Sequence, residues 1–129
     1  MMPRHFTFGP ADGVPAPVAP YSHATAHAGV LHVTGQMPLD PATHMLPDGI
    51  VAQTDQVMAN LKRVVELCGG SWQSVFSVRA YLTSIDLYPD FNTAYESWFA
   101  GPLPTRTCVA VTGLAVGALV EVDLLAALE

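Results

Sequence analysis

The chain has 129 residues and a formal net charge of −6; 50% of its residues are hydrophobic and 12% are charged. This length predicts one domain, residues 1–129, with a hydrophobic core of its own. The acidic balance and the lack of a basic cluster argue against binding to nucleic acid or to an anionic membrane surface. So low a charged fraction also predicts that other subunits cover part of the surface.

The N-terminus and the cysteines bear on the cellular compartment. The N-terminal region has one arginine and no apolar segment typical of a signal peptide, and no apolar run reaches the length of a transmembrane helix. Cys68 and Cys108 lie far apart and match no metal-binding or redox spacing. We therefore expect a cytoplasmic protein with reduced thiols.

The first part of the chain predicts extended structure. Residues 1–15 form an N-terminal segment that we expect to be partly extended, because residues 3–8 alternate weakly between polar and apolar and indicate a short edge strand. Four prolines in residues 9–20 exclude a helix and a central strand there. The stiff loop leads to Tyr21, which either is fixed by this backbone for function or only packs its ring.

A hairpin is predicted next, with strands at 24–27 and 30–34 around a turn at Ala28-Gly29. Gly35, directly after the second strand, indicates a bulge or a close backbone approach. Residues 38–49 are rich in turn-forming residues and predict a connection without regular structure.

The period then changes to helical over residues 50–68, and Gly69-Gly70 supplies the stop. The expected core face of this helix consists of apolar residues, including a core thiol at its end: Val57, Met58, Leu61, Val64, Val65 and Cys68. A strand follows at 75–82, with Phe76, Val78, Ala80 and Leu82 expected on one face and Ser77, Arg79 and Tyr81 on the other.

A second helix is predicted from Pro89 to the stop at Gly101-Pro102, with Asn92 off its apolar stripe and free to face a cleft. Two nearly continuous apolar runs, 107–112 and 119–126, predict final strands with both faces covered. The order β-β-β-α-β-α-β-β indicates an α+β domain, with two helices on one face of a mixed sheet. A partner chain must then cover the other face.

The histidines do not form a metal site by spacing. His23, His27, His32 and His44 recur in the first third of the chain, but none are paired at i, i+4 on a helix and no Cys or Glu completes a ligand set. We expect no metal.

Arg106 and Glu121 are the two charged residues whose positions call for an explanation. Arg106 stands at the mouth of an apolar run and Glu121 inside another, where an unpaired charge is costly. If their strands pair through the turn near 113–117, the two side chains can work together. The pair is then either catalytic or a structural ion pair at the edge of the sheet.

These residues belong to an ordered set of short motifs spread over residues 16–127. The set comprises Ala19-Pro20-Tyr21-Ser22, Val33-Thr34-Gly35-Gln36-Met37-Pro38, Gln53-Thr54, Asn60-Leu61-Lys62, Asn92 with Tyr95-Glu96, Pro104-Thr105-Arg106-Thr107-Cys108-Val109 and Val120-Glu121-Val122. In this set the chain resembles the RidA (YjgF) family of reactive imine deaminases. The resemblance implies a chorismate-mutase-like fold and a homotrimer with sites in the clefts between subunits.

The resemblance also implies roles for individual residues. Arg106 matches the arginine that holds the substrate carboxylate, and Glu121 matches the glutamate that positions and deprotonates a water. The other matching site residues are Tyr21, Thr34 (in place of a common serine), Gly35, Asn92 and Cys108, whose backbone carbonyl helps to hold the water. The implied reaction is hydrolysis of 2-imino or enamine acids to 2-ketoacids and ammonia, without a cofactor.

Three other functions stay open at this stage. The cleft could serve a non-catalytic protein that binds a small carboxylate, or a deaminase for a specialised substrate such as 2-aminomuconate. Glu121 favours an enzyme, because binding an acid needs the arginine and gains nothing from a nearby carboxylate. An endoribonuclease or translation-inhibitor role has also been attached to the family, and the acidic balance disfavours it.

Overall fold

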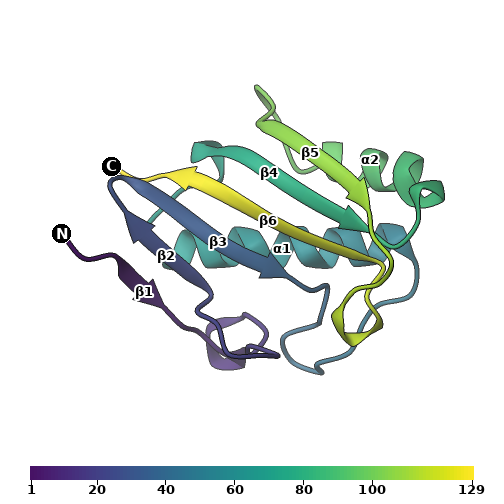
Figure 1. Ribbon diagram of the computed structural model, residues 1–129, viewed down its shortest axis with the longest axis horizontal. Helices are drawn as coiled ribbons and strands as arrows, with labels where there is room; N and C mark the ends of the chain where they lie inside the picture. Colours follow the sequence, from purple (N-terminus) through teal and green to yellow (C-terminus); the bar gives the residue numbers. More distant parts are fainter.

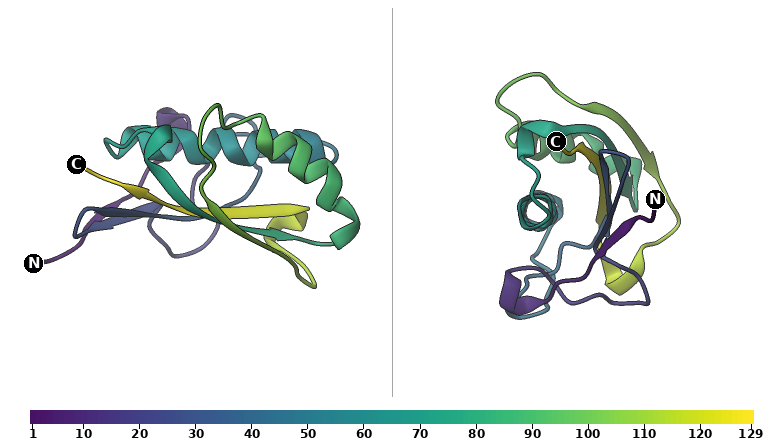
Figure 2. Two further views of the ribbon diagram at one scale, coloured as in Figure 1. Left: turned by 90° about the horizontal axis from the view of Figure 1, so that it is seen from above. Right: turned by 90° about the vertical axis from the view of Figure 1, so that its left-hand side faces the viewer.

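Two helices pack against one face of a six-stranded mixed sheet, and the other face of the sheet carries no cover (Figure 1; Figure 2). This computed structural model describes residues 1–129. The elements are β1 (Arg4–Phe6), β2 (Ala24–His27), β3 (Val30–Gln36), α1 (Ile50–Leu67), β4 (Val75–Leu82), α2 (Tyr88–Glu96), β5 (Thr105–Ala110) and β6 (Val120–Ala127). The predicted α+β class and the order β-β-β-α-β-α-β-β are confirmed.

The strand order is β1-β2-β3-β6-β4-β5, so the last strand of the chain lies inside the sheet. β1, β2 and β3 form an antiparallel meander, β6 pairs antiparallel with both β3 and β4, and β5 pairs parallel with β4 at the outer edge. The pairing of the last two strands that was considered from the sequence therefore does not form. β4 separates them, because the chain crosses over through α2 before β5 forms.

The hairpin predicted at 24–34 is confirmed. Ala28 and Gly29 both have positive φ, 52° and 79°, as a two-residue turn between right-twisted strands requires. The second strand runs two residues further than expected and ends at Gln36. Its register with β6 shifts between Val33 and Gln36, which places Gly35 in the irregularity.

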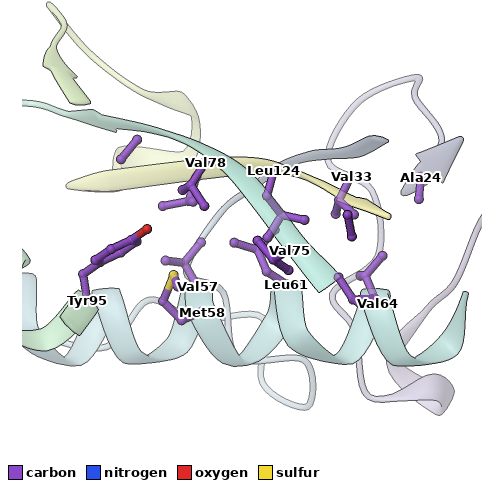
Figure 3. Packing of buried hydrophobic residues seen from close by; sticks show 14 of the residues in the cluster. Ala24, Val33, Val57, Met58, Leu61, Val64, Val75, Val78, Tyr95 and Leu124 are labelled. Carbon is purple, nitrogen blue, oxygen red and sulfur yellow. The ribbon is translucent and has the colours of Figure 1, made fainter. Parts of the chain in front are cut away.

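α1 supplies the centre of the core. Its apolar face packs on β3, β4 and β6, as expected from the helical period, and Figure 3 shows Val57, Met58, Leu61 and Val64 pointing at the sheet. Gly69, at φ 87°, ends the helix, and the next amide, of Gly70, donates to the Val65 carbonyl at 2.9 Å. Cys68 is buried beside this end and is a core thiol, as predicted. Burial raises its pKa to about 11.

Several boundaries and faces differ from expectation. Phe76 is 44% exposed, because the β4–β6 register shifts between Val75 and Ser77 and turns it out of the core. α2 ends at Glu96, well before Gly101-Pro102, and β5 occupies 105–110 and not 107–112. In the single chain β5 has no buried residue, so the prediction that both of its faces are covered is wrong here.

Two buried amides of α1 hold the segments that flank β3 and β6. Asn60 Nδ2 donates to the carbonyls of Met37 and Leu39 at 3.1 and 2.9 Å. Gln53 Oε1 accepts from the Leu119 amide at 2.9 Å, directly before β6. Neither α1 nor α2 is long and apolar enough to cross a membrane.

Replacing Asn60 with alanine should weaken the fold. The Met37 and Leu39 carbonyls lose their donor while still buried, so we expect the free energy of unfolding to fall by about 2–4 kcal/mol. The measurement is urea unfolding at fixed protein concentration. The matched control is Gln56→Ala, which removes one part-buried bond to Asn60 and should cost less than about 1 kcal/mol. Equal losses for both variants would contradict this role for Asn60.

Candidate functional site

The candidate residues form two groups on opposite faces of the sheet. Arg106 pairs in register with Val78, a core residue under the helices, and therefore faces α2. Glu121 lies between Val120 and Val122, which are fully buried in the core, so its side chain leaves on the uncovered face. Its cross-strand neighbour there is Tyr81.

On the helix side, Arg106 is held by aromatic rings and not by an acid. Its guanidinium carbon lies 5.5, 5.5 and 4.9 Å from the ring centres of Tyr88, Phe91 and Tyr95. One nitrogen donates to the Tyr88 hydroxyl at 3.0 Å. Such stacking suits the flat, weakly hydrated guanidinium. The only ion pair in the chain is Arg79–Asp123, so the charge of Arg106 has no acidic partner.

A pocket of about 220 Å³ opens beside this guanidinium. Its lining consists of Asn92, Tyr95, Glu96, Leu103, Pro104 and Arg106. Two buried atoms on this wall lack any hydrogen-bond partner, Asn92 Oδ1 and Tyr95 Oη. The pocket thus combines a cation with free donors, an unused acceptor and an unused hydroxyl, which suits a small polar anion.

Cys108 follows Arg106 on the same face of β5 and is partly buried. Burial raises the pKa of its thiol, and the positive charge of Arg106 opposes that rise. The thiol is therefore protonated near neutral pH and is a poor nucleophile.

On the uncovered face, the Glu121 carboxylate lies directly against the backbone of Gly35. A Cβ at position 35 would overlap that carboxylate, and Gly35 has no left-handed φ, so the close approach alone explains the glycine. Glu121 receives no hydrogen bond from any group in the chain. Burial first, and then the negative charge of Asp123, raise the pKa of its carboxyl above the ordinary value. It is a carboxylate without a hydrogen-bond partner.

Thr34 and Gly35 line a hollow of about 490 Å³ on the same face. His5, His32 and Arg79 line it as well. Tyr21 is 36% exposed on the segment before β2, and its hydroxyl accepts from the Val18 amide at 3.2 Å. This one bond ties the ring to the loop before it.

Arg106 and Glu121 do not meet in one chain. They lie on opposite faces, with β4 between their strands, so the structural ion pair considered from the sequence does not form. The sequence missed Tyr88, whose hydroxyl accepts from Arg106, and the carboxylate Asp123 beside Glu121. The sequence signals that could have identified them are the position of Tyr88 at the start of the second helix and the position of Asp123 two residues after Glu121 on the last strand. Among His, Cys, Asp and Glu side chains, no group of three stands close enough to hold a metal ion.

Comparisons with known proteins agree on one family. The family model described as Endoribonuclease L-PSP matches residues 12–128. A RutC family protein of Sulfurisphaera tokodaii is 37% identical over 86% of this chain and 90% of its own length. A Lactococcus lactis protein described as a regulator, AldR, is 31% identical over 87% of this chain and 90% of its own. The crystal structure of RidA from an Antarctic Psychrobacter superposes with a TM-score of 0.91 at 30% identity, covering 97% of this chain and 99% of that one.

Gly35→Ala should move the Glu121 carboxylate while leaving the fold intact. The end of a glutamate side chain can swing away from a new methyl group, so we expect the free energy of unfolding to change by less than about 1 kcal/mol. A crystal structure, or the carboxyl ¹³C resonance of Glu121, measures the displacement. Gly113→Ala, where a Cβ meets nothing within 4 Å, is the control. Glu121 in its original position in Gly35→Ala would refute the explanation.

Proposed function

Since the chain belongs to the YjgF/RidA family, we propose that it hydrolyses reactive 2-imino and enamine acids to 2-ketoacids and ammonia. In this proposal it is a cofactor-independent deaminase. The observation that carries the proposal is Arg106, a partly buried guanidinium without an acidic partner that opens on a small pocket. A planar donor fork in such a place matches a carboxylate with two parallel hydrogen bonds.

In the proposed reaction the substrate carboxylate docks on Arg106, with Asn92 beside it. Glu121 takes a proton from a water, and the oxygen of that water attacks the carbon of the protonated imine. Glu121 then returns this proton to the nitrogen of the carbinolamine, the C–N bond breaks to release ammonia, and the hydroxyl group loses its proton as the C=O bond of the ketoacid forms. The unpartnered carboxylate of Glu121, whose pKa burial raises, supports its role as the base.

The remaining site residues complete the pocket in this proposal. Tyr21 and Thr34 supply hydroxyl groups near the substrate, and Gly35 leaves room beside its backbone for the Glu121 carboxylate. The Cys108 carbonyl helps to hold the water. The raised pKa of the Cys108 thiol supports a backbone role and not a nucleophilic one.

Because Arg106 and Glu121 lie on opposite faces of one sheet, the proposed site needs two chains. We propose a homotrimer in which Arg106 of one subunit meets Glu121 of the next. The uncovered sheet face and the exposed edge strand β5 supply surface for such contacts (Figure 2). A closed ring repeats one heterologous contact, so each subunit gives one half to each of two sites.

A second candidate is a regulator that binds a small carboxylate in the same cleft. The relative described as a regulator, AldR, favours it. A binder needs Arg106 but gains nothing from an unpartnered acid near its ligand, so Glu121 favours the deaminase. A deaminase restricted to a specialised acid, such as 2-aminomuconate, uses the same chemistry.

The test generates imines in place from a panel of amino acids with an amino-acid oxidase and follows the decay of each imine. We expect the wild type to accelerate decay. Arg106→Lys keeps the charge but loses the planar fork, and should lower kcat/KM about 10²- to 10³-fold. Glu121→Gln should lower kcat by about 10²-fold and leave the binding of unreactive 2-ketoacids within a few-fold. Full activity in either variant would exclude the mechanism.

Mixing two inactive variants tests whether the site is shared. Arg106→Ala and Glu121→Gln, unfolded together in equal amounts and refolded, should give a trimer population in which about a quarter of all sites combine an intact arginine with an intact glutamate. We therefore expect activity to return to about that fraction of the wild type, measured in the same decay assay. Each variant refolded alone is the control. No recovery in mixed trimers, confirmed by mass spectrometry, would place both residues in one subunit.

A further inference from the structure

A network of three polar side chains lies beside Glu121 on the uncovered face. Asp123 follows two residues along β6, and the alternation of the strand places it on the same face as Glu121. On β4, Tyr81 stands opposite Glu121 and Arg79 stands opposite Asp123. The two acids and the two possible donors thus form a square.

Both donors in this square go to Asp123. Arg79 Nε donates to Asp123 Oδ1 at 2.8 Å, and the Tyr81 hydroxyl donates to Asp123 Oδ2 at 3.1 Å. Glu121 receives nothing, although Tyr81 is its direct cross-strand neighbour. Asp123 therefore occupies the groups that could otherwise bind the carboxylate of Glu121.

We propose that Asp123, fixed by Arg79 and Tyr81, is a positioning residue that sets the pH range in which Glu121 acts as a base. This inference rests on the proposed function, in which Glu121 is the base. Asp123 acts in two ways in the same direction. Its own negative charge disfavours a second one nearby, and its hold on Arg79 and Tyr81 keeps both donors from Glu121.

The other surroundings of Glu121 do not substitute for this network. From β3 it faces Gly35, which does not titrate, while His32 stands further along, opposite Leu125. Burial raises the pKa of Glu121 first and Asp123 raises it further. In the proposed trimer, Arg106 of the adjoining subunit acts in the opposite sense, and it is the same in every variant below.

A purely stabilising role does not account for the network. The side chain of Arg79 is 66% exposed and that of Asp123 17% exposed in the single chain, and such ion pairs contribute little to folding. Its specific effect is that Arg79 and Tyr81 donate to Asp123 and not to Glu121.

The test is the titration of Glu121 by carboxyl ¹³C NMR in the assembled, substrate-free protein. The chain has four glutamates, Glu66, Glu96, Glu121 and Glu129, so labelled glutamate gives four resonances and Glu121→Gln assigns the one of interest. Asp123→Asn keeps the shape, removes the charge and frees Arg79. We expect the midpoint of Glu121 to fall by about one pH unit or more.

Arg79→Met should shift the same midpoint upward, because it leaves the charge of Asp123 uncompensated. Opposite shifts from two variants of one ion pair are the signature of the proposal, since a structural role moves both the same way or neither. Asp48→Asn, an exposed acid in the loop before α1, is the matched control and should leave the midpoint unchanged. The acid limb of the kcat/KM profile should follow the NMR midpoints.

An unchanged midpoint in Asp123→Asn, or shifts of the same sign in Asp123→Asn and Arg79→Met, would overturn the inference. The titration uses no substrate, so its result is separate from that of the decay assay. Opposite shifts in a protein that accelerates no imine decay would support the network and refute the deaminase. Imine decay with unmoved midpoints would support the deaminase and refute the network.

Discussion

The pleat of the sheet is the constraint on which the rest of this molecule depends. Side chains alternate along a strand, so burying Val120 and Val122 under the helices forces Glu121 out on the other side. The parallel register of β5 with β4 puts Arg106 on the helix side by the same rule. No rotamer brings the two charges together across a sheet, and a site that uses both must be completed by a second chain.

In the single chain neither Arg106 nor Glu121 has an oppositely charged partner, and the surroundings of the two side chains differ. Three aromatic rings lie close to the guanidinium of Arg106 and attract its positive charge in the absence of an acidic partner. Glu121 has no such support. Because its folded pKa is raised, the fold favours its protonated form, and the stability gained at low pH is lost as the pH rises through the folded pKa. Ionised Glu121 thus works against the fold at the pH at which a base is needed.

Elements with strong local signals could be predicted from the sequence. The hairpin at Ala28-Gly29, the core face of α1 and the limits of β4 follow from turn chemistry and periodicity. The sequence could not decide whether β5 pairs with β6, because neighbours in sequence need not be neighbours in the sheet, and no local sequence signal marks the crossover through α2. Phe76 was misplaced for a related reason, since a register shift reverses the alternation from which its face was inferred.

For the candidate site, sequence motifs identified residues but not their arrangement. Gln53 and Asn60 belong to the same motif set as Arg106, yet their role in the structure is to bind the backbone. Gln53 accepts a hydrogen bond from the segment before β6, and Asn60 donates to the segment after β3. The network around Asp123 could not be predicted either. Arg79 and Tyr81 could donate to Glu121 or to Asp123, and only the pairing of β4 with β6 in three dimensions shows that both donate to Asp123.

In the proposed assembly, Arg106, Asp123 and the bound substrate all affect the pKa of Glu121 and therefore its strength as a base. Bringing Arg106 of one subunit to Glu121 of the next places a positive charge near the carboxylate and lowers its pKa. A base stabilised in this way would be weak at the moment when the substrate is bound. Asp123 pulls in the opposite direction from within the subunit that carries Glu121, and it does so before assembly. The negative charge of the docked substrate further offsets that of Arg106, so Glu121 keeps the basicity that burial and Asp123 give it.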